Sequence, residues 1–241
     1  MILLYVAFTL FALLLMYLLF LGVCCLLVNP EKEYDKNSPF YRFLLDSATA
    51  AAMKLLRIRV LVSGMEKIPK DTKVLFVSNH RSNFDPIVTW YALKKWKIAF
   101  VSKPSNFKIP FFGRIIRKCC FLPIDRENPR NAIVTINKAA KLLKKQEVSI
   151  GIYPEGTRSK HSQLLPFHTG VFKIAQKAEA PIVVLCVTGT EKISKRTPFR
   201  RTDVYLDVLE VFSAQAIKET KTETIGTAVR RLIEINTEKR E

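Results

Sequence analysis

The sequence predicts an α/β fold with a mostly parallel central sheet flanked by helices, preceded by a transmembrane or membrane-associated helical segment. Two observations predict it. Short apolar, β-branched runs alternate with helix-like stretches over most of the chain, and the first 28 residues are almost entirely apolar. We therefore expect three parts: a transmembrane helix over 1–28, a linker with a membrane-associated amphipathic helix over 29–57, and an α/β domain over 58–241.

The N-terminal run over 2–28 contains no charge and no proline. As a helix it would be about 40 Å long, which exceeds a hydrocarbon core of about 30 Å. A cleaved signal peptide is the competing interpretation. The run lacks a positive first region, its apolar part is too long, and no small-x-small cleavage site precedes Asn29. These features favour a retained anchor.

After a polar linker, the residues up to 57 predict a second helix. Its apolar positions are spaced three and four apart: Phe40, Leu44, Leu45, Ala48, Ala52, Leu55 and Leu56. The helix either lies on or dips into the membrane, or it packs against the core as an ordinary amphipathic helix, and the pattern fits both.

The rest of the chain alternates between strand and helix patterns. The runs that predict strands are 59–64, 73–78, 97–102, 119–124, 148–153, 181–187 and the longer 203–212. Helical patterns cover 86–95, 129–146 and 169–178, and a last helix is expected near 222–237. Glycine-rich phosphate-binding loops and the GxSxG elbow of serine hydrolases do not occur, so neither nucleotide binding nor a serine hydrolase elbow is supported.

The net charge of +18 indicates an anionic partner. Charge alone fits both nucleic acid and an anionic membrane surface, but a tethered protein directs its positive charge most economically at lipid headgroups. We therefore expect membrane lipids as a partner and no nucleic acid. The α/β domain should lie on the cytoplasmic face, because positive flanks tend to stay there.

Cysteine and histidine usage gives no sign of a metal. The five cysteines form no CxxC pair, and His161 and His168 have no cysteine or carboxylate cluster around them. We expect neither a disulfide framework nor a metal site.

The stretch "SNHRSNFDP" places His80 five positions before Asp85, between a predicted strand and a predicted helix. On one helix, positions five apart point about 140° away from each other, but in a loop the two side chains can meet. Asp85 could then accept one imidazole N–H and leave the other nitrogen as a base. Because proline is favoured at the first helical position, we also expect Asp85 to be the N-cap of the helix that Pro86 begins. The alternative is that Asp85 only caps this helix and His80 is a surface residue.

Two further stretches carry candidate functional residues. "IYPEGTRS" follows a predicted strand and packs a carboxylate, a glycine, a threonine and a guanidinium into positions 155–158, although a charged turn reads the same way. Residues 100–124 contain five basic residues and no acidic one, interleaved with large apolar groups. Such a mixture fits a surface that rests on a bilayer, and it equally fits a solvated basic face over a core.

Together these motifs resemble the glycerolipid acyltransferase family, and most closely its 1-acylglycerol-3-phosphate acyltransferases. The first block of that family, Asn-His-x-x-x-x-Asp, is matched by Asn79, His80 and Asp85. The second is matched by Gly113 and by "FLPIDR" with Asp125 and Arg126, the third by Tyr153 to Ser159, and the fourth by Pro181 and Ile182. His168 and Val184 depart from the lysine and second proline that are usual there.

The resemblance implies transfer of a fatty acyl group from a thioester to the free hydroxyl of lysophosphatidic acid. His80 would be the general base, and Asp85 would orient it. Arg126, Arg158 and Lys103 would hold the acceptor phosphate, while Glu155, Gly156 and Thr157 would line the acceptor site. No cofactor is expected, since the donor, acyl-CoA or acyl carrier protein, is a substrate.

Two alternatives remain open from the sequence. The acceptor could be another lysophospholipid or glycerol-3-phosphate. From a different class, the chain could be a non-catalytic, membrane-anchored basic protein that binds lipid or nucleic acid, which explains the charge and the anchor but not four ordered motifs.

Overall fold

The computed structural model describes residues 1–159, 163–197 and 199–240. The strands are β1 (Ile58–Ser63), β2 (Leu75–Ser78), β3 (Ile98–Ser102), β4 (Leu122–Pro123), β5 (Ser149–Ile152), β6 (Ile182–Thr188) and β7 (Thr202–Phe212). They form a single sheet in the order β1-β7-β6-β2-β5-β3-β4. Among these strands the β6–β7 pair is antiparallel and the others are parallel, which confirms the predicted fold class.

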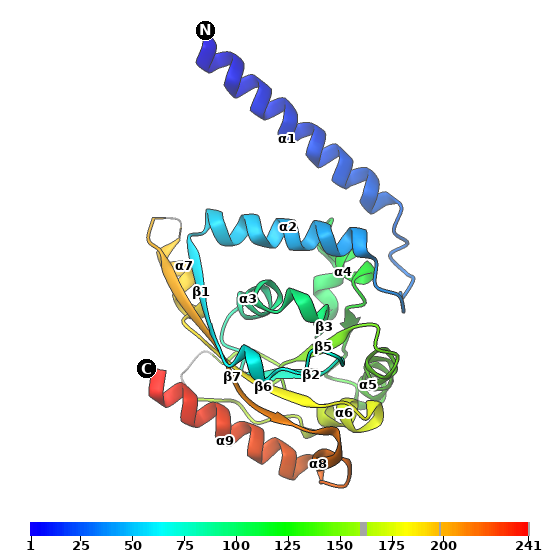
Figure 1. The fold of residues 1–241 in the computed structure, drawn as a ribbon. Helices are drawn as coiled ribbons and strands as arrows, with labels where there is room; N and C mark the ends of the chain where they lie inside the picture. Colours follow the sequence, from blue (N-terminus) through cyan, green and yellow to red (C-terminus); the bar gives the residue numbers. More distant parts are fainter. Residues whose placement is uncertain (160–162, 198, 241) are drawn as a thin grey trace.

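Helices cover both faces of the sheet (Figure 1). One face carries α2 (Pro39–Leu55), α3 (Asp85–Ala92) and α4 (Phe112–Lys118), and the other carries α5 (Pro129–Lys144), α6 (Lys173–Ala178) and α9 (Thr222–Arg240). Short α7 (Ile193–Arg196) follows β6, and α8 (Ala214–Lys218) precedes α9. The 3-10 turns are η1 (Met65–Lys67), η2 (Lys94–Trp96), η3 (Pro104–Lys108), η4 (Thr169–Phe172) and η5 (Thr190–Lys192).

The sheet divides the core into two layers. Leu75 and Val77 pack with the layer under α5, α6 and α9, whereas Val74 and Phe76 pack with the layer under α2 and α3. This alternation is the period of two of a strand, and apolar residues on both faces explain the continuous apolar runs of the sequence. All seven residues of β6 are buried for the same reason.

The apolar helix α1 (Ile2–Leu26) extends away from the domain (Figure 1). Its stretch Leu4–Leu26 is long and apolar enough to cross a membrane, as judged by length and composition. Its last turn is held by the domain, because the Tyr41 hydroxyl donates to the Cys24 carbonyl oxygen at 2.7 Å and Arg114 donates to the Cys25 carbonyl oxygen at 2.8 Å. The assignment of 1–28 to a membrane span stays a prediction.

Helix α2 presents two different faces. Its inner face buries Arg42, which donates to the Ile98 carbonyl oxygen and lies over the Trp90 ring at 4.5 Å. Its outer face leaves Phe43 and Leu55 65% and 74% exposed. The core-packing interpretation therefore holds for one face, and contact of the other face with lipid stays a prediction.

The segment 107–124 differs from the prediction. The expected strand over 119–124 shortens to the two residues of β4, because residues 112–118 form α4 and Cys119 ends that helix. Cys120 adopts a φ of 63°, which no strand residue does. The alternating basic and apolar residues hid a helix whose inner side contributes Ile115 and Ile116 to the core.

Gly113 allows α4 to approach the preceding segment. A Cβ at this position would lie 2.3 Å from the Phe107 carbonyl oxygen and 2.6 Å from its carbonyl carbon, both backbone atoms. We expect Gly113→Ala to lower the free energy of unfolding by about 1–3 kcal/mol, since the backbone must shift. Urea unfolding of the full chain measures this. Gly170→Ala is the control, because nothing lies within 4 Å of a Cβ there, and equal stability of the two variants would contradict the packing.

Candidate active site

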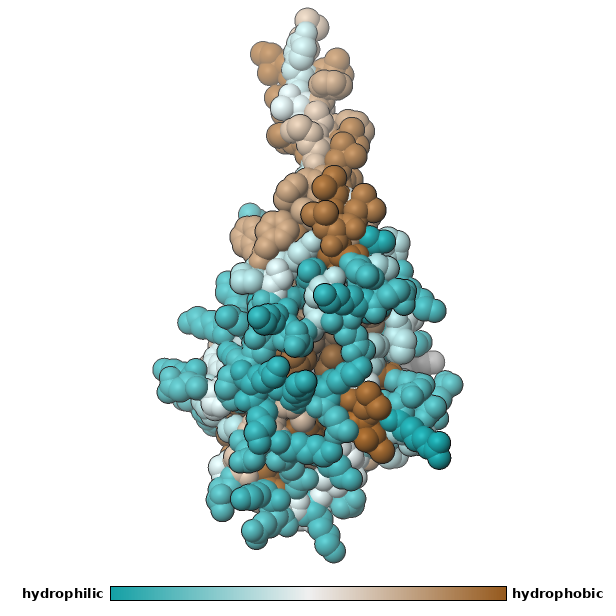
Figure 2. Space-filling model, turned by 90° about the vertical axis from the view of Figure 1, so that its right-hand side faces the viewer, coloured by the Kyte–Doolittle hydropathy of each residue, from teal (hydrophilic) through white to brown (hydrophobic). Residues whose placement is uncertain are grey.

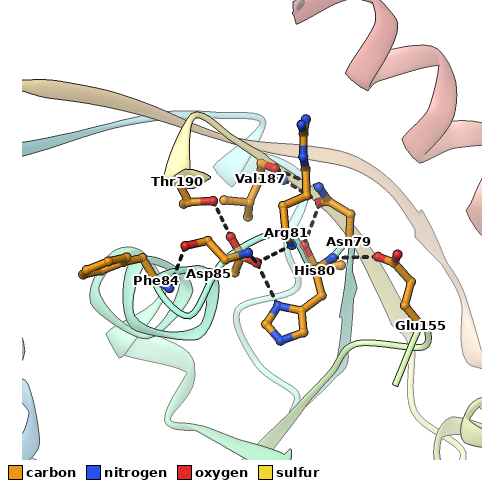
Figure 3. A network of polar contacts seen from close by, with 10 residues as sticks. Asn79, His80, Arg81, Phe84, Asp85, Glu155, Val187 and Thr190 are labelled. Carbon is orange, nitrogen blue, oxygen red and sulfur yellow. Dashed lines mark hydrogen bonds and ion pairs between the residues drawn. The ribbon is translucent and has the colours of Figure 1, made fainter. Parts of the chain in front are cut away.

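His80, in the loop after β2, lies beside Asp85, the first residue of α3 (Figure 3). His80 Nδ1 is 2.8 Å from Asp85 Oδ2. Asp85 is buried, and the His80 side chain is 16% exposed. The proximity proposed from the sequence is thus confirmed, and His80 Nε2 makes no hydrogen bond within the described residues.

Asp85 does not cap its helix, so that prediction was wrong. Helix α3 begins with Asp85 itself after Phe84, and its carboxylate turns back toward the preceding loop. Asp85 Oδ2 accepts the backbone N–H groups of Arg81 and Ser82, each at 2.7 Å, in addition to facing His80. Asp85 is the first residue of the helix and lies one position after the N-cap, Phe84. From there its carboxylate reaches the N–H groups of the preceding loop and holds that loop and the imidazole in place.

Thr190 completes the surroundings of Asp85 and was not predicted. Its buried hydroxyl donates to Asp85 Oδ1 at 2.5 Å. Thr190 follows β6, and β6 lies beside β2 in the sheet, so the loops after these two parallel strands meet at the same edge. Asn79 joins the same strands, since its side chain donates to and accepts from the Val187 backbone, at 2.8 Å each.

Glu155 links the third motif to the first. Its Oε1 accepts the His80 backbone N–H at 2.7 Å, and its Oε2 accepts the Leu165 N–H at 2.9 Å. The Ser159 N–H donates to the His80 carbonyl oxygen at 2.8 Å, so the two loops are bonded on both sides. Burial raises the pKa of Glu155 above its usual value, and the two N–H groups oppose that change. Glu155 thus holds the loop that carries His80 in place through a backbone hydrogen bond.

Tyr153 places His80 beside a pocket. Its ring stacks on the imidazole with 4.4 Å between centroids, and Tyr153 is also among the residues that line a pocket of about 500 Å³, which His80 itself does not line. Arg126, Gly156 and His168 line the same pocket, and most of the remaining wall is apolar: Val101, Ile124, Ile133, Ile136, Ile152, Phe167 and Val171. The pocket therefore combines positive charge with a hydrocarbon surface.

Two residues of the family motifs, Asp125 and Gly156, shape the backbone next to the pocket. Asp125 accepts from Glu127, Asn128 and Asn131, which fixes the turn carrying Arg126, and these bonds, that from Asn131 foremost, lower the pKa of Asp125. Gly156 has a φ of 69°, and a Cβ there would lie 3.0 Å from the His168 ring. A side chain at position 156 would be strained and would crowd the pocket.

The other predicted substrate residues lie elsewhere. Lys103, Thr157 and Arg158 are exposed and do not line the pocket, so their roles stay predictions. Of the two histidines considered as metal ligands, His168 lies beside Gly156 and His161 falls outside the described residues. Within the described part of the chain, three or more His, Cys, Asp or Glu side chains do not gather in one place.

Cys119 and Cys120, which precede β4, are buried thiols. Burial raises the pKa of Cys119 and of Cys120 to about 12. Both therefore remain protonated at neutral pH and are poor nucleophiles.

The comparisons with known proteins assign the chain to a family. A family model described as Acyltransferase matches residues 59–188, more than half of the chain, and the chain belongs to this family. The match contains His80, Asp85, Glu155 and the strands that carry them.

Particular relatives agree with this assignment. The chain is 38% identical over 133 residues to the chloroplastic 1-acyl-sn-glycerol-3-phosphate acyltransferase BAT2 of Brassica napus, covering 55% of this chain and 38% of that one. It is 40% identical over 116 residues to the 1-acyl-sn-glycerol-3-phosphate acyltransferase of Escherichia coli K12, covering 48% and 47%. The crystal structure of the 1-acyl-sn-glycerophosphate acyltransferase PlsC from Thermotoga maritima matches with a TM-score of 0.68, 25% identity, and coverage of 82% and 78%.

The chain spans only part of its curated relatives. The aligned stretch covers 38% of the Brassica napus protein, 47% of the Escherichia coli protein and 58% of the Salmonella typhimurium LT2 protein of the same name. The family is therefore shown over the domain that holds the site.

Proposed function

We propose that the chain transfers a fatty acyl group from an acyl thioester to the sn-2 hydroxyl of 1-acyl-sn-glycerol-3-phosphate, giving phosphatidic acid. The observation that carries the proposal is the His80–Asp85 pair at 2.8 Å, with His80 Nε2 unpartnered within the described residues and the ring stacked on Tyr153, a residue of the pocket wall. The relatives named above carry this activity in their names.

The reaction requires one base. His80 Nε2 takes the proton of the acceptor hydroxyl as its oxygen bonds to the thioester carbonyl carbon. The carbon–sulfur bond then breaks, and His80 returns the proton to the leaving thiolate. Asp85 holds the Nδ1–H and stabilises the imidazolium between the two steps. The substrate supplies the hydroxyl, so no acyl-enzyme and no resident cofactor are needed.

The acceptor fits the pocket beside Tyr153. Arg126 and His168 line it and present donors for a phosphate, and the apolar wall suits the 1-acyl chain. The 500 Å³ volume falls in the range of small-ligand pockets. In this arrangement Glu155 and Gly156 shape the acceptor site, with Lys103, Thr157 and Arg158 in outer positions.

The membrane supplies this substrate. The apolar helix α1 would anchor the chain, with the α/β domain on the cytoplasmic face where soluble donors are found. Either acyl-CoA or acyl carrier protein could deliver the thioester.

The proposal is tested with the full chain purified in detergent. Lysophosphatidic acid would be offered with acyl-CoA or acyl-acyl carrier protein, and thiol release and phosphatidic acid would be measured. Glycerol-3-phosphate and other lysophospholipids serve as competing acceptors. Faster turnover of one of these would contradict the proposed acceptor, and no thiol release with any pair would contradict the enzyme.

Arg126 and Arg158 can be distinguished by kinetics. We expect Arg126→Gln to raise the KM for the acceptor about ten- to a hundredfold at little cost in kcat, because a charged hydrogen bond contributes about 1.5–3 kcal/mol. Arg158→Gln should raise it less, since Arg158 does not line the pocket. An Arg126→Gln enzyme with unchanged KM would remove Arg126 from the phosphate site.

A further inference from the structure

A second cleft, of about 770 Å³, lies where the end of α1 meets the segment leading into α4. It is separate from the candidate active site, and the proposed reaction does not use it. Its charged lining consists of Lys108, Arg114 and Arg117 with a single acidic residue, Glu31. Within the described residues, the three basic side chains form no ion pair.

The cleft is a built structure. Arg114 donates to the Cys25 carbonyl oxygen at 2.8 Å, which fixes the last turn of α1 against the domain. Phe111 adopts a φ of 59°, a strained value for a bulky residue, and its ring approaches Gly22 of α1. These contacts hold the two walls of the cleft together.

Arg117 brings an unsatisfied donor to this place. Its Nε is buried and has no hydrogen-bond partner among the described residues. Its guanidinium lies 5.1 Å from the centre of the Phe107 ring, which orients the planar group without neutralising it. A buried donor without an acceptor is costly, and the half-exposed guanidinium that carries it is where an anion can bind.

The position of the cleft relates it to the bilayer. The exposed apolar side chains of α1 continue down to the domain, whose surface below is mainly hydrophilic (Figure 2). Next to the cleft, Ile109, Phe111 and Phe112 are exposed. A helix of 25 residues spans about 38 Å, so with α1 in the bilayer its last turn reaches headgroup level. Phosphates of the leaflet are found at this level.

We propose that this cleft binds the headgroup phosphate of an anionic glycerophospholipid of the membrane. Arg117 and Lys108 bind the phosphate oxygens, Arg114 adds charge while it holds α1, and the lipid chains lie beside Ile109, Phe111 and Phe112. Charge complementarity selects this occupant, because a zwitterionic headgroup brings its own cation. The inference needs α1 in the bilayer but not the proposed reaction.

Native mass spectrometry of the full chain tests this directly. The protein in detergent would be titrated with phosphatidylglycerol or with phosphatidylcholine of the same chains, and bound lipid would be counted. We expect phosphatidylglycerol to bind at least about tenfold more tightly, and Lys108→Gln/Arg117→Gln to remove most of this preference. Lys218 ends α8 and Lys221 directly precedes α9, at the end of the domain that lies far from α1 in Figure 1. Lys218→Gln/Lys221→Gln therefore removes the same charge away from the cleft and should leave the preference unchanged.

Further variants separate the cleft from other effects. Lys108→Gln alone changes an exposed side chain and should weaken phosphatidylglycerol binding about threefold even if the double variant folds poorly. Arg126→Gln removes lipid bound in the candidate active site but not this preference. Thiol release by the double variant, measured on detergent-solubilised substrate, reports the proposed reaction independently. Unchanged phosphatidylglycerol binding in the cleft variants, or equal binding of the two lipids to wild type, would overturn the proposal.

Discussion

Replacing His80 with alanine is expected to reduce thiol release by at least a factor of about 10²–10⁴ and leave the fold intact. The loss follows because the alcohol then has no base, and general acid–base catalysis contributes about this factor. The fold should survive because the hydrogen bonds that hold the loop use the His80 backbone. The His80 N–H donates to Glu155, and the His80 carbonyl oxygen accepts from the Ser159 N–H. Alanine keeps both bonds.

The measurement is a rate of thiol release in detergent at saturating lysophosphatidic acid, together with thermal unfolding of the same samples. His168→Gln is a matched control, because it removes a histidine from the pocket wall but not from the His80–Asp85 pair. It should alter the KM for the acceptor more than kcat. A folded His80→Ala protein that keeps more than about a tenth of the wild-type rate would refute the role of His80.

The sheet could be predicted because its strands carry their own signal. β6 is buried on both faces, so all its positions must be apolar or small, and this run cannot be mistaken for a polar turn. The sequence also placed each of the two motifs directly after a strand, and because β2 and β5 are parallel neighbours their loops meet at one edge of the sheet. The resemblance to a family rested on four motifs that occur in the expected order along the chain.

The parts that sequence reasoning missed depend on spatial neighbours. Thr190 reaches Asp85 only because β6 lies beside β2, and this strand order is not written in any local pattern. The strand expected over 119–124 shortened to β4 because α4, which the sequence did not predict, occupies the residues just before it; the apolar residues of α4 face the core while its basic residues remain near the surface. The short segment 112–124 fits both the helical period of 3.6 residues and the strand period of two, and tertiary packing decided between them.

The Asp85 carboxylate was expected as a helix cap because proline follows it. Proline does stand in the first turn of α3, as the capping rule requires, but the Asp85 side chain accepts from donors in the preceding loop. Three of them, the His80 ring and the N–H groups of Arg81 and Ser82, converge on one oxygen. A single carboxylate satisfies more buried donors this way than as a cap.

Asp85→Asn is expected to separate catalysis from stability. An amide oxygen in place of Oδ2 can still accept from the three donors in the loop, and the Thr190 hydroxyl can rotate to accept from the amide nitrogen. The loop should therefore stay folded. The neutral amide no longer stabilises the imidazolium, so kcat should fall by a factor of about 10²–10⁴.

Asp85→Ala provides the contrast that makes the result decisive. It removes the acceptor of the part-buried Arg81 N–H, the buried Ser82 N–H and the buried Thr190 hydroxyl, at about 1–3 kcal/mol for each buried group left unsatisfied, so it should lose stability as well as activity. Thr190→Val removes one donor only and should reduce kcat far less than Asp85→Asn. Urea unfolding and thiol release on the three variants check this order. If Asp85→Asn kept wild-type kcat, or unfolded as readily as Asp85→Ala, the carboxylate would serve the fold alone, and His80 would need no charged partner to act as a base.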